Sequence, residues 1–85
     1  MPYKIEIVKS AEKESQKIDK KYLRRIVASI NTLSDNPFPL NTKKLVGSDS
    51  SYRLRAGQYR ILYEVDTNNK IVTIFRIRHR KDAYK

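Results

Sequence analysis

The first half of the chain shows two successive hydrophobic patterns, one typical of a strand and one typical of helices. Residues 3–8 alternate apolar and charged side chains, which predicts a half-buried strand. From Ser10 onward the apolar positions recur at helical spacing, until an Asp-Asn-Pro sequence ending at Pro37 interrupts them. Ser10 can cap the first helix, and Asp19 is a second N-cap candidate. The pattern therefore predicts a helical pair within residues 10–36.

The second half of the chain predicts three strands joined by short turns. The candidates are residues 51–55, 59–65 and 70–79, and residues 37–50 before them are expected to form a loop. Ala-Gly-Gln and Asp-Thr-Asn-Asn separate the candidates, and these residue types tolerate turn dihedrals. A strand, a helical pair and a three-stranded antiparallel meander make an α+β domain, with the helices on one face of the sheet. The length of 85 residues allows one such domain.

Alternation along these strands separates apolar side chains from arginines. Because successive side chains of a strand point to opposite faces, Tyr52 and Leu54 share one face and Arg53 takes the other. With the apolar set packed against the helices, the arginines on the face without helices are Arg53, Arg55, Arg60, Arg76, Arg78 and Arg80. The same rule places the following residues on the helix side: Phe75, Ile77 and His79.

Three apolar residues and two lysines complete the arginine face. Simple alternation places Leu62, Val72 and Ile74 beside the arginines, as an apolar floor under the C-terminal tail or as a seat for a partner. Lys43 and Lys44 precede the first of these strands and are expected to rim the face. Like charges on adjacent strands repel, so this arrangement is costly without an anionic ligand. An ordinary solvated sheet face is the alternative.

Charge and composition narrow the classes of function. The chain has 19 Lys and Arg against 9 Asp and Glu, and residues 43–85 carry eleven basic and four acidic residues. A concentrated excess predicts binding to a polyanion, most often nucleic acid, whereas a merely soluble basic surface is the alternative. Without cysteine, and with His79 as its single histidine, the chain offers no disulfide, thiolate or histidine-rich metal site. No apolar run approaches the roughly 20 residues of a membrane helix and no signal-peptide pattern is present, so we expect a cytoplasmic protein without a membrane partner.

A cationic surface of this kind suits cleavage of RNA without a metal. A nuclease that uses the RNA 2′-hydroxyl needs cations to stabilise the phosphate as negative charge builds up, a base near the 2′-oxygen and an acid near the leaving 5′-oxygen. Arginine meets the first need because its planar fork grips phosphate through two hydrogen bonds. The C-terminal residues 79–85 bring histidine, arginine, lysine and tyrosine together. The arginine-bearing strands offer no carboxylate pair, so we expect neither a metal nor another cofactor.

Four segments of the chain resemble the RelE family of toxin–antitoxin toxins. They are Lys44-Leu45-Val46-Gly47, Tyr52-Arg53-Leu54-Arg55, the segment from Gly57 to Val65 and the segment from Ile77 to Tyr84. The more specific parts are the Gly-x-Tyr-Arg-x-x-Tyr strand and the terminal His-Arg-x-Asp-x-Tyr, and the order of elements fits that family over nearly all of the chain. The resemblance implies one RelE-like toxin domain over residues 1–85, which enters the ribosomal A site and cleaves the mRNA there.

The resemblance also implies roles for individual residues. Arg60 matches the arginine that contacts the scissile phosphate, and Tyr84 matches a tyrosine that stacks on or orients the substrate base. Either Arg80 or Lys81 matches the cation near the leaving group. Further basic residues expected to bind RNA are Lys43, Lys44, Arg76 and Arg78.

Arg53 and Arg55 depart from the family pattern. They match positions that are lysines in the best-studied members of the family, one of which is a proposed general base. Arginine is a poor proton acceptor because its guanidinium stays protonated in proteins. The base is then His79, Lys81, Tyr84 or a hydroxide held by the arginines, unless His79 is a structural residue at the strand end.

The implied partners are mRNA, the ribosome and a cognate RelB-like antitoxin, a short chain that wraps the toxin and folds on binding. Two alternatives remain at this point. A ParE-like toxin shares the fold but poisons DNA gyrase and cuts nothing, and a non-catalytic nucleic-acid-binding module would explain the charge alone. The terminal Arg80, Lys81 and Tyr84 favour the RelE interpretation.

Overall fold

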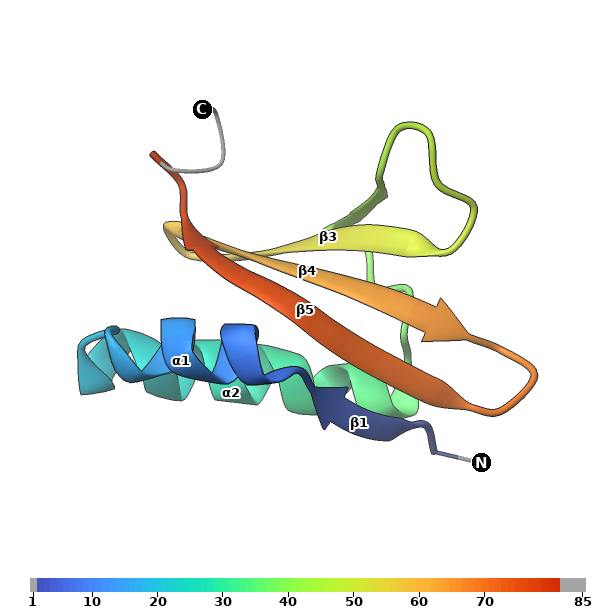
Figure 1. The fold of residues 1–85 in the computed structure, drawn as a ribbon, viewed down its shortest axis with the longest axis horizontal. Coiled ribbons are helices and arrows are strands. Elements are labelled where there is room, and N and C mark those ends of the chain that lie inside the picture. Colours follow the sequence, from blue (N-terminus) through green and yellow to red (C-terminus); the bar gives the residue numbers. More distant parts are fainter. Residues whose placement is uncertain (1, 82–85) are drawn as a thin grey trace.

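The computed structural model of the chain describes residues 2–81, in which two helices cover one face of a β-sheet and leave the other face open (Figure 1). In chain order the elements are β1 (Lys4–Ile7), α1 (Lys9–Gln16), α2 (Lys20–Asp35), β2 (Thr42–Lys44), β3 (Ser51–Ala56), β4 (Tyr59–Asp66) and β5 (Ile71–His79). The strands follow the order β1-β5-β4-β3-β2, with β1 parallel to β5 and the other neighbours antiparallel. The predicted α+β arrangement, with its N-terminal strand, helical pair and antiparallel meander, is confirmed.

The helical region divides at Asp19, as the sequence predicts. The Asp19 carboxylate accepts a hydrogen bond from the Lys21 N–H at 3.3 Å at the start of α2. The predicted cap at Ser10 is wrong, because α1 already includes that residue and its N-cap, Val8, makes no side-chain cap hydrogen bond. The Val8 N–H instead donates to Ile74 O at 3.0 Å, so the chain passes directly from sheet pairing into the helix.

The segment expected to be a loop, residues 37–50, contains the edge strand β2. A three-residue strand is too short to show alternation in a sequence, and it forms here because β3 offers a free edge. Tyr63 of β4 holds this segment in place. Its buried hydroxyl donates to Pro37 O at 2.7 Å and lies 2.6 Å from Thr42 Oγ1.

β5 contains an extra residue, Phe75, that shifts its alternation. Leu62 of β4 pairs with Arg76, but the next residue of β4, Tyr63, pairs with Ile74. Phe75 is therefore left without a partner across the ladder, which is the arrangement of a β-bulge. Side chains before and after the bulge follow opposite phases of the strand period.

The bulge corrects the placement of three residues. Val72 and Ile74 were expected beside the arginines, but both are fully buried in the core on the helix side. Phe75 was expected to share the helix side with Ile77, but Ile77 is in the core whereas Phe75 is half-buried outside it. Of the expected apolar floor only Leu62 stays on the arginine face, opposite arginines of β3 and β5. Simple alternation along a sequence cannot detect an inserted residue. The bulge lies in β5, so the three wrong placements all belong to that strand.

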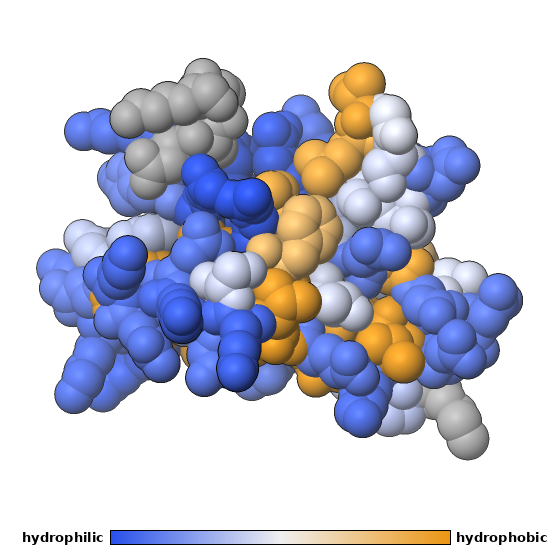
Figure 2. Space-filling model, viewed as in Figure 1, coloured by the Kyte–Doolittle hydropathy of each residue, from blue (hydrophilic) through white to orange (hydrophobic). Residues whose placement is uncertain are grey.

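The core lies between the helix layer and the sheet. Its buried side chains are Ala11, Ile26, Ile30, Leu33, Leu54, Ala56, Ile61, Tyr63, Val65, Val72, Ile74 and Ile77. Figure 2 shows that hydrophilic side chains cover most of the surface in that view, with small hydrophobic patches between them. The buried apolar side chains are thus gathered on the helix side of the sheet, and the other side carries mainly arginines, with Leu62 among them.

We expect Tyr63→Phe to lower the free energy of unfolding by about 1–2 kcal/mol, because the buried Pro37 carbonyl loses its donor. Burial raises the pKa of the Tyr63 hydroxyl above its ordinary value of 10.0, against a smaller lowering by the hydrogen bond with Thr42. In the unfolded chain this hydroxyl ionises near pH 10, so its stabilising contribution is complete below that pH and is lost as the pH rises further. Urea denaturation from about pH 7 to about pH 11 should show the difference between wild type and variant shrinking.

Tyr52→Phe is the control for this prediction. Tyr52 stacks on Tyr63 at a centroid distance of 5.8 Å, but its hydroxyl has no hydrogen-bond partner among the described residues. Its removal should change the free energy of unfolding much less. Equal effects of the two substitutions would contradict the role given to the Tyr63 hydroxyl.

Candidate functional site

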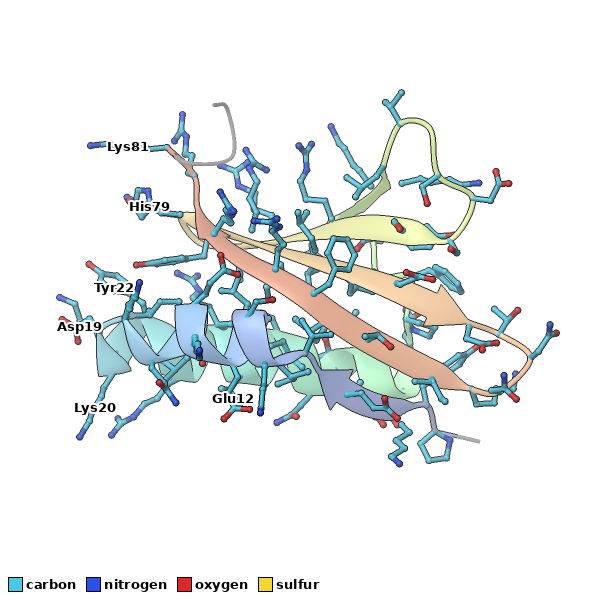
Figure 3. The ribbon with its side chains drawn as sticks, in the orientation of Figure 1. Glu12, Asp19, Lys20, Tyr22, His79 and Lys81 are labelled. Carbon is cyan, nitrogen blue, oxygen red and sulfur yellow. The ribbon has the colours of Figure 1, made fainter. Side chains whose placement is uncertain are left out.

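Cross-strand register brings arginines of β3, β4 and β5 onto the open face of the sheet. Arg60 of β4 lies opposite Arg55 of β3 on one side and opposite Arg78 of β5 on the other. Two residues further along β4, on the same face, Leu62 lies between Arg53 of β3 and Arg76 of β5. Residues directly opposite on paired strands point to the same face. Figure 3 shows nitrogen-tipped side chains rising from this face, away from the helices.

A pocket of about 380 Å³ opens on this face beside β2. Its lining residues come from the loop before β2 and from three strands: Leu40, Asn41, Lys43, Arg53, Arg55 and Arg60. Lys43 reaches the pocket because it lies opposite Arg53 in the ladder between β2 and β3. Arg60 is buried, Arg53 is half-buried and Arg55 is exposed. The cations therefore stand at different depths, with Arg60 the deepest.

Four cations around one pocket make it a site for an anion. Arginine stays protonated in proteins, so each of the three arginines contributes a full positive charge. A concave site lined by one sign of charge concentrates the field, and guanidinium forks match the geometry of phosphate oxygens. Within the described part of the chain, no carboxylate lines the pocket. The arrangement can hold a phosphate group and stabilise additional negative charge on it.

Arg78 shares the open face by register but is bound at the sheet edge by Glu14 of α1. Arg78 Nε lies 3.4 Å from Glu14 Oε2, and Glu14 Oε1 accepts a hydrogen bond from the Ile77 N–H at 3.0 Å. β1 pairs with β5 only as far as Ile74, so Glu14 supplies the acceptor that a strand partner would give beyond that point. No motif marks Glu14 in the sequence, because the contact joins positions 63 residues apart.

Lys44 does not rim the arginine face as expected. It lies opposite Tyr52 in the ladder, on the helix side of the sheet, and is exposed. The expectation treated Lys43 and Lys44 as loop residues, whereas they belong to β2, and adjacent strand residues point to opposite faces. Only Lys43 of the two lysines reaches the pocket.

His79 lies on the helix side of the sheet, away from the arginine pocket. It pairs with Tyr59, and the two rings meet edge to face with their centroids 5.2 Å apart. His79 Nδ1 accepts a hydrogen bond from the Lys81 N–H at 3.2 Å, and Figure 3 shows His79 at the end of the sheet between Lys81 and Tyr22. This position suits a structural residue at the strand end and separates His79 from Arg53 and Arg60.

Of the remaining expected site residues, Arg76 lies within β5 opposite Leu62, and the others follow the end of that strand. Arg76, Arg80 and Lys81 are exposed, and the Arg80 N–H donates to Gln58 O at 2.6 Å, which holds the segment against the turn between β3 and β4. Tyr84 lies outside the described residues, so its expected role stays a prediction. Residues 2–81 contain neither a group of three or more His, Cys, Asp or Glu residues that could hold a metal ion nor a helix long and apolar enough to span a membrane.

Comparison with known proteins identifies the family. The model described as "ParE toxin of type II toxin-antitoxin system, parDE" matches residues 5–84. The chain belongs to the RelE/ParE superfamily of toxins. RelE1 of Methanocaldococcus jannaschii is 35% identical to this toxin over 100% of the chain and 98% of its own length, and toxin RelG of Mycobacterium tuberculosis is 32% identical over 100% and 99%.

The fold of the toxin is also shared with a solved relative. The crystal structure of an archaeal RelE–RelB complex from Pyrococcus horikoshii OT3 has a TM-score of 0.84 at 30% identity, and the match covers 94% of this chain and 97% of that chain. The resemblance to RelE toxins that the Gly-x-Tyr-Arg-x-x-Tyr strand carries is thereby confirmed.

We expect Glu14→Ala to destabilise the toxin by about 1–3 kcal/mol, because the Ile77 N–H loses its acceptor and Arg78 loses its carboxylate partner. Glu14→Gln keeps an oxygen acceptor and should recover most of this loss, since a partly exposed ion pair contributes little by itself. Glu12→Ala is the control, as the Glu12 side chain points away from the sheet (Figure 3). Urea denaturation measures all three, and equal losses from the Ala and Gln variants at Glu14 would contradict the hydrogen-bonding role.

Proposed function

We propose that this toxin is a ribosome-dependent endonuclease that cleaves mRNA in the ribosomal A site and needs no metal. The observation that carries the proposal is the pocket on the open face, where Lys43, Arg53, Arg55 and Arg60 surround a space that a phosphate can enter. The names RelE1 and RelG of its relatives support the RelE branch of the superfamily. The toxin acts in the cytoplasm, where translating ribosomes are found.

The proposed reaction uses the 2′-hydroxyl of the RNA as the nucleophile. The 2′-oxygen loses its proton and bonds to phosphorus, and the bond from phosphorus to the 5′-oxygen of the next nucleotide breaks. The products are a 2′,3′-cyclic phosphate and a free 5′-hydroxyl. Arg60 stabilises the negative charge that builds up on the phosphate oxygens, and Arg53 and Arg55 grip the same group from the rim. Arg80 or Lys81 stabilises the negative charge on the leaving 5′-oxygen, which takes up a proton from solvent to become the 5′-hydroxyl.

The group that accepts the 2′-proton is Lys81, Tyr84 or a hydroxide held by the arginines. Arg53 and Arg55 are excluded as bases because guanidinium groups stay protonated. His79 faces the helix side, and its Nδ1 is already engaged by the Lys81 N–H. The toxin thus depends on charge stabilisation in the pocket more than on a dedicated base.

Dependence on the ribosome follows from the kind of contact the pocket can make. Contacts to phosphate position an RNA but carry no sequence information. Cleavage also requires the 2′-oxygen, phosphorus and leaving oxygen to be held near a line, and such positioning accounts for a large part of many enzymatic rate enhancements. The ribosome supplies it by holding the A-site codon.

The partner that controls the toxin is a cognate, RelB-like antitoxin. The P. horikoshii structure is that of a RelE–RelB complex. The net charge of +10 on the present chain favours an acidic partner segment that covers the arginine face. Covering the pocket would both block the RNA site and remove the repulsion between its cations.

A ParE-like activity is the second candidate, because the family model that matches the chain is described as a ParE toxin. Such a toxin poisons DNA gyrase and leaves RNA intact. The two candidates differ in what accumulates in treated cells, namely cut mRNA or gyrase-dependent DNA breaks. A basic module that only binds nucleic acid would produce neither.

The deciding experiment adds purified toxin to a programmed translation reaction and maps mRNA ends by primer extension. We expect new ends within the A-site codon only when ribosomes are present. Efficient cutting of naked mRNA at the same toxin concentration would contradict ribosome dependence. Intact mRNA together with gyrase-dependent DNA breaks would favour the ParE-like activity.

We expect Arg60→Ala to lower the cleavage rate about 10²–10³-fold, as for the loss of one group that stabilises developing charge. Growth of cells that express the variant and primer extension with the purified protein both measure this loss. Arg60 is buried, so Arg55→Ala, which removes an exposed cation from the same pocket, provides a second variant that should fold normally and cleave more slowly. Arg24→Ala removes one charge from the exposed surface of α2 and should retain full toxicity. Full toxicity of both pocket variants would exclude this catalytic assignment.

We expect the association rate of the antitoxin to fall at least about tenfold between low and high salt, because unlike charges steer the encounter. The dissociation rate should change much less. Stopped-flow mixing over a range of sodium chloride concentrations separates the two rates. An association rate independent of salt would argue against an acidic segment docking on the arginine face.

A further inference from the structure

Leu40 is a fully exposed leucine that lines the pocket of cations. Its side chain is 105% exposed, and the other lining residues are an asparagine, a lysine and three arginines. Single exposed apolar residues are common on protein surfaces. This one, however, stands beside an anion site, so the pocket has one apolar wall and one cationic wall. Such a pocket fits a ligand that has an apolar part next to an anionic part.

The loop that carries Leu40 is held in a fixed position. The Thr42 N–H donates to Pro39 O at 3.1 Å, which closes a four-residue turn with Leu40 at its second position. The Tyr63 hydroxyl bonds to Pro37 O and to Thr42 Oγ1, so both ends of the loop are attached to the core. The turn therefore presents the leucine side chain to the pocket without depending on a ligand to order it.

Asn41, the next residue, attaches the same turn to β3. Asn41 Nδ2 donates to Arg55 O at 2.9 Å, and the Arg55 N–H donates to Asn41 O at 3.4 Å. These two bonds set the separation between the apolar wall at Leu40 and the cation at Arg55. A ligand that touches both walls meets a preorganised site and loses little affinity to ordering of the protein.

We propose that Leu40 packs against the flat face of a nucleobase whose phosphate occupies the arginine pocket. This inference rests on the proposed function and assigns a part of the RNA to each wall of the pocket. A nucleotide carries a flat apolar ring beside its phosphate, and a volume of about 380 Å³ lies within the range of pockets that hold one small ligand, roughly 300–1,000 Å³. The leucine side chain has no hydrogen-bonding group, and every base has a flat face, so the contact accepts all four bases.

Val46, which follows β2 in the chain as Leu40 precedes it, offers a matched control. Its side chain is 104% exposed, as fully as that of Leu40, and it is not among the residues that line the pocket. Leu40→Ala and Val46→Ala each remove an exposed apolar side chain and leave the core untouched, so both variants should fold as the wild type does.

The test compares these variants on normal and abasic RNA. Ribosomes are programmed with an mRNA whose A-site codon carries a normal or an abasic ribonucleotide on either side of the cleaved bond, and single-turnover cleavage rates are measured. Leu40→Ala is expected to lower the rate about tenfold on the normal codon, the size of effect that burial of one apolar contact supplies, and to leave the rate on the abasic codon unchanged. Val46→Ala should match the wild type on both. The loss in Leu40→Ala should be similar for all four bases.

Equal losses on normal and abasic codons would overturn the inference, as would equal behaviour of the Leu40 and Val46 variants. An acidic peptide segment of the antitoxin also has apolar and anionic parts and is the alternative ligand for this pocket. Titration of the toxin variants with the antitoxin measures their affinity for it. Weaker antitoxin binding by Leu40→Ala together with unchanged cleavage would assign the leucine to that peptide and not to RNA.

A binding experiment separates this inference from the proposed function. It measures the affinity of free toxin for a fluorescent 2′-O-methyl trinucleotide, which cannot be cleaved, with and without its central base. If wild-type toxin cleaves nothing on ribosomes, the proposed function fails and the binding experiment decides alone. Binding that depends on the base and is weakened about tenfold in Leu40→Ala would support the inference. Binding independent of the base, or no binding of RNA at all, would overturn it.

Discussion

The pairing register of β3, β4 and β5 is the constraint on which both faces of the sheet depend. It sets Arg60 between Arg55 and Arg78 on the open face, and by the same pairing it sets Ile61 between Leu54 and Ile77 in the core. A shift of any strand by one residue would exchange the two faces and bury arginines against the helices. The apolar core therefore enforces the face on which the cations lie, because a one-residue slip would put apolar side chains in water.

This arrangement places like charges close together, which is unfavourable by itself. Lys43, Arg53, Arg55 and Arg60 surround one pocket, and in the described part of the chain no carboxylate lines it. The repulsion between these cations is offset by the other face, where fully buried apolar side chains from the helices and strands pack together. A sheet covered by helices on one face only allows this division, since the open face is free to gather groups that bind a ligand instead of groups that stabilise the fold.

Tyr63 connects the two faces. Its ring is buried in the core, while its hydroxyl holds Pro37 and Thr42 at the two ends of the loop that borders the pocket. The rim of the pocket is thereby attached to the buried core. Glu14 does the equivalent at the opposite edge of the sheet, where it holds the β5 backbone at Ile77. Both residues act through hydrogen bonds between distant parts of the chain, and neither touches the pocket itself.

The sequence alone determined the order of the elements apart from β2, the division of the helices at Asp19 and the separation of arginines from apolar side chains along β3 and β4. These features depend on local periodicity and capping, which each segment carries by itself. Tertiary structure decided the bulge at Phe75, the strand that turns Lys44 away from the pocket and the pairing that sets His79 against Tyr59. It also decided the contact of Glu14 with β5. Each of these features depends on which backbone groups pair across the sheet. Such pairing joins two distant segments, so neither segment reveals it by its own sequence.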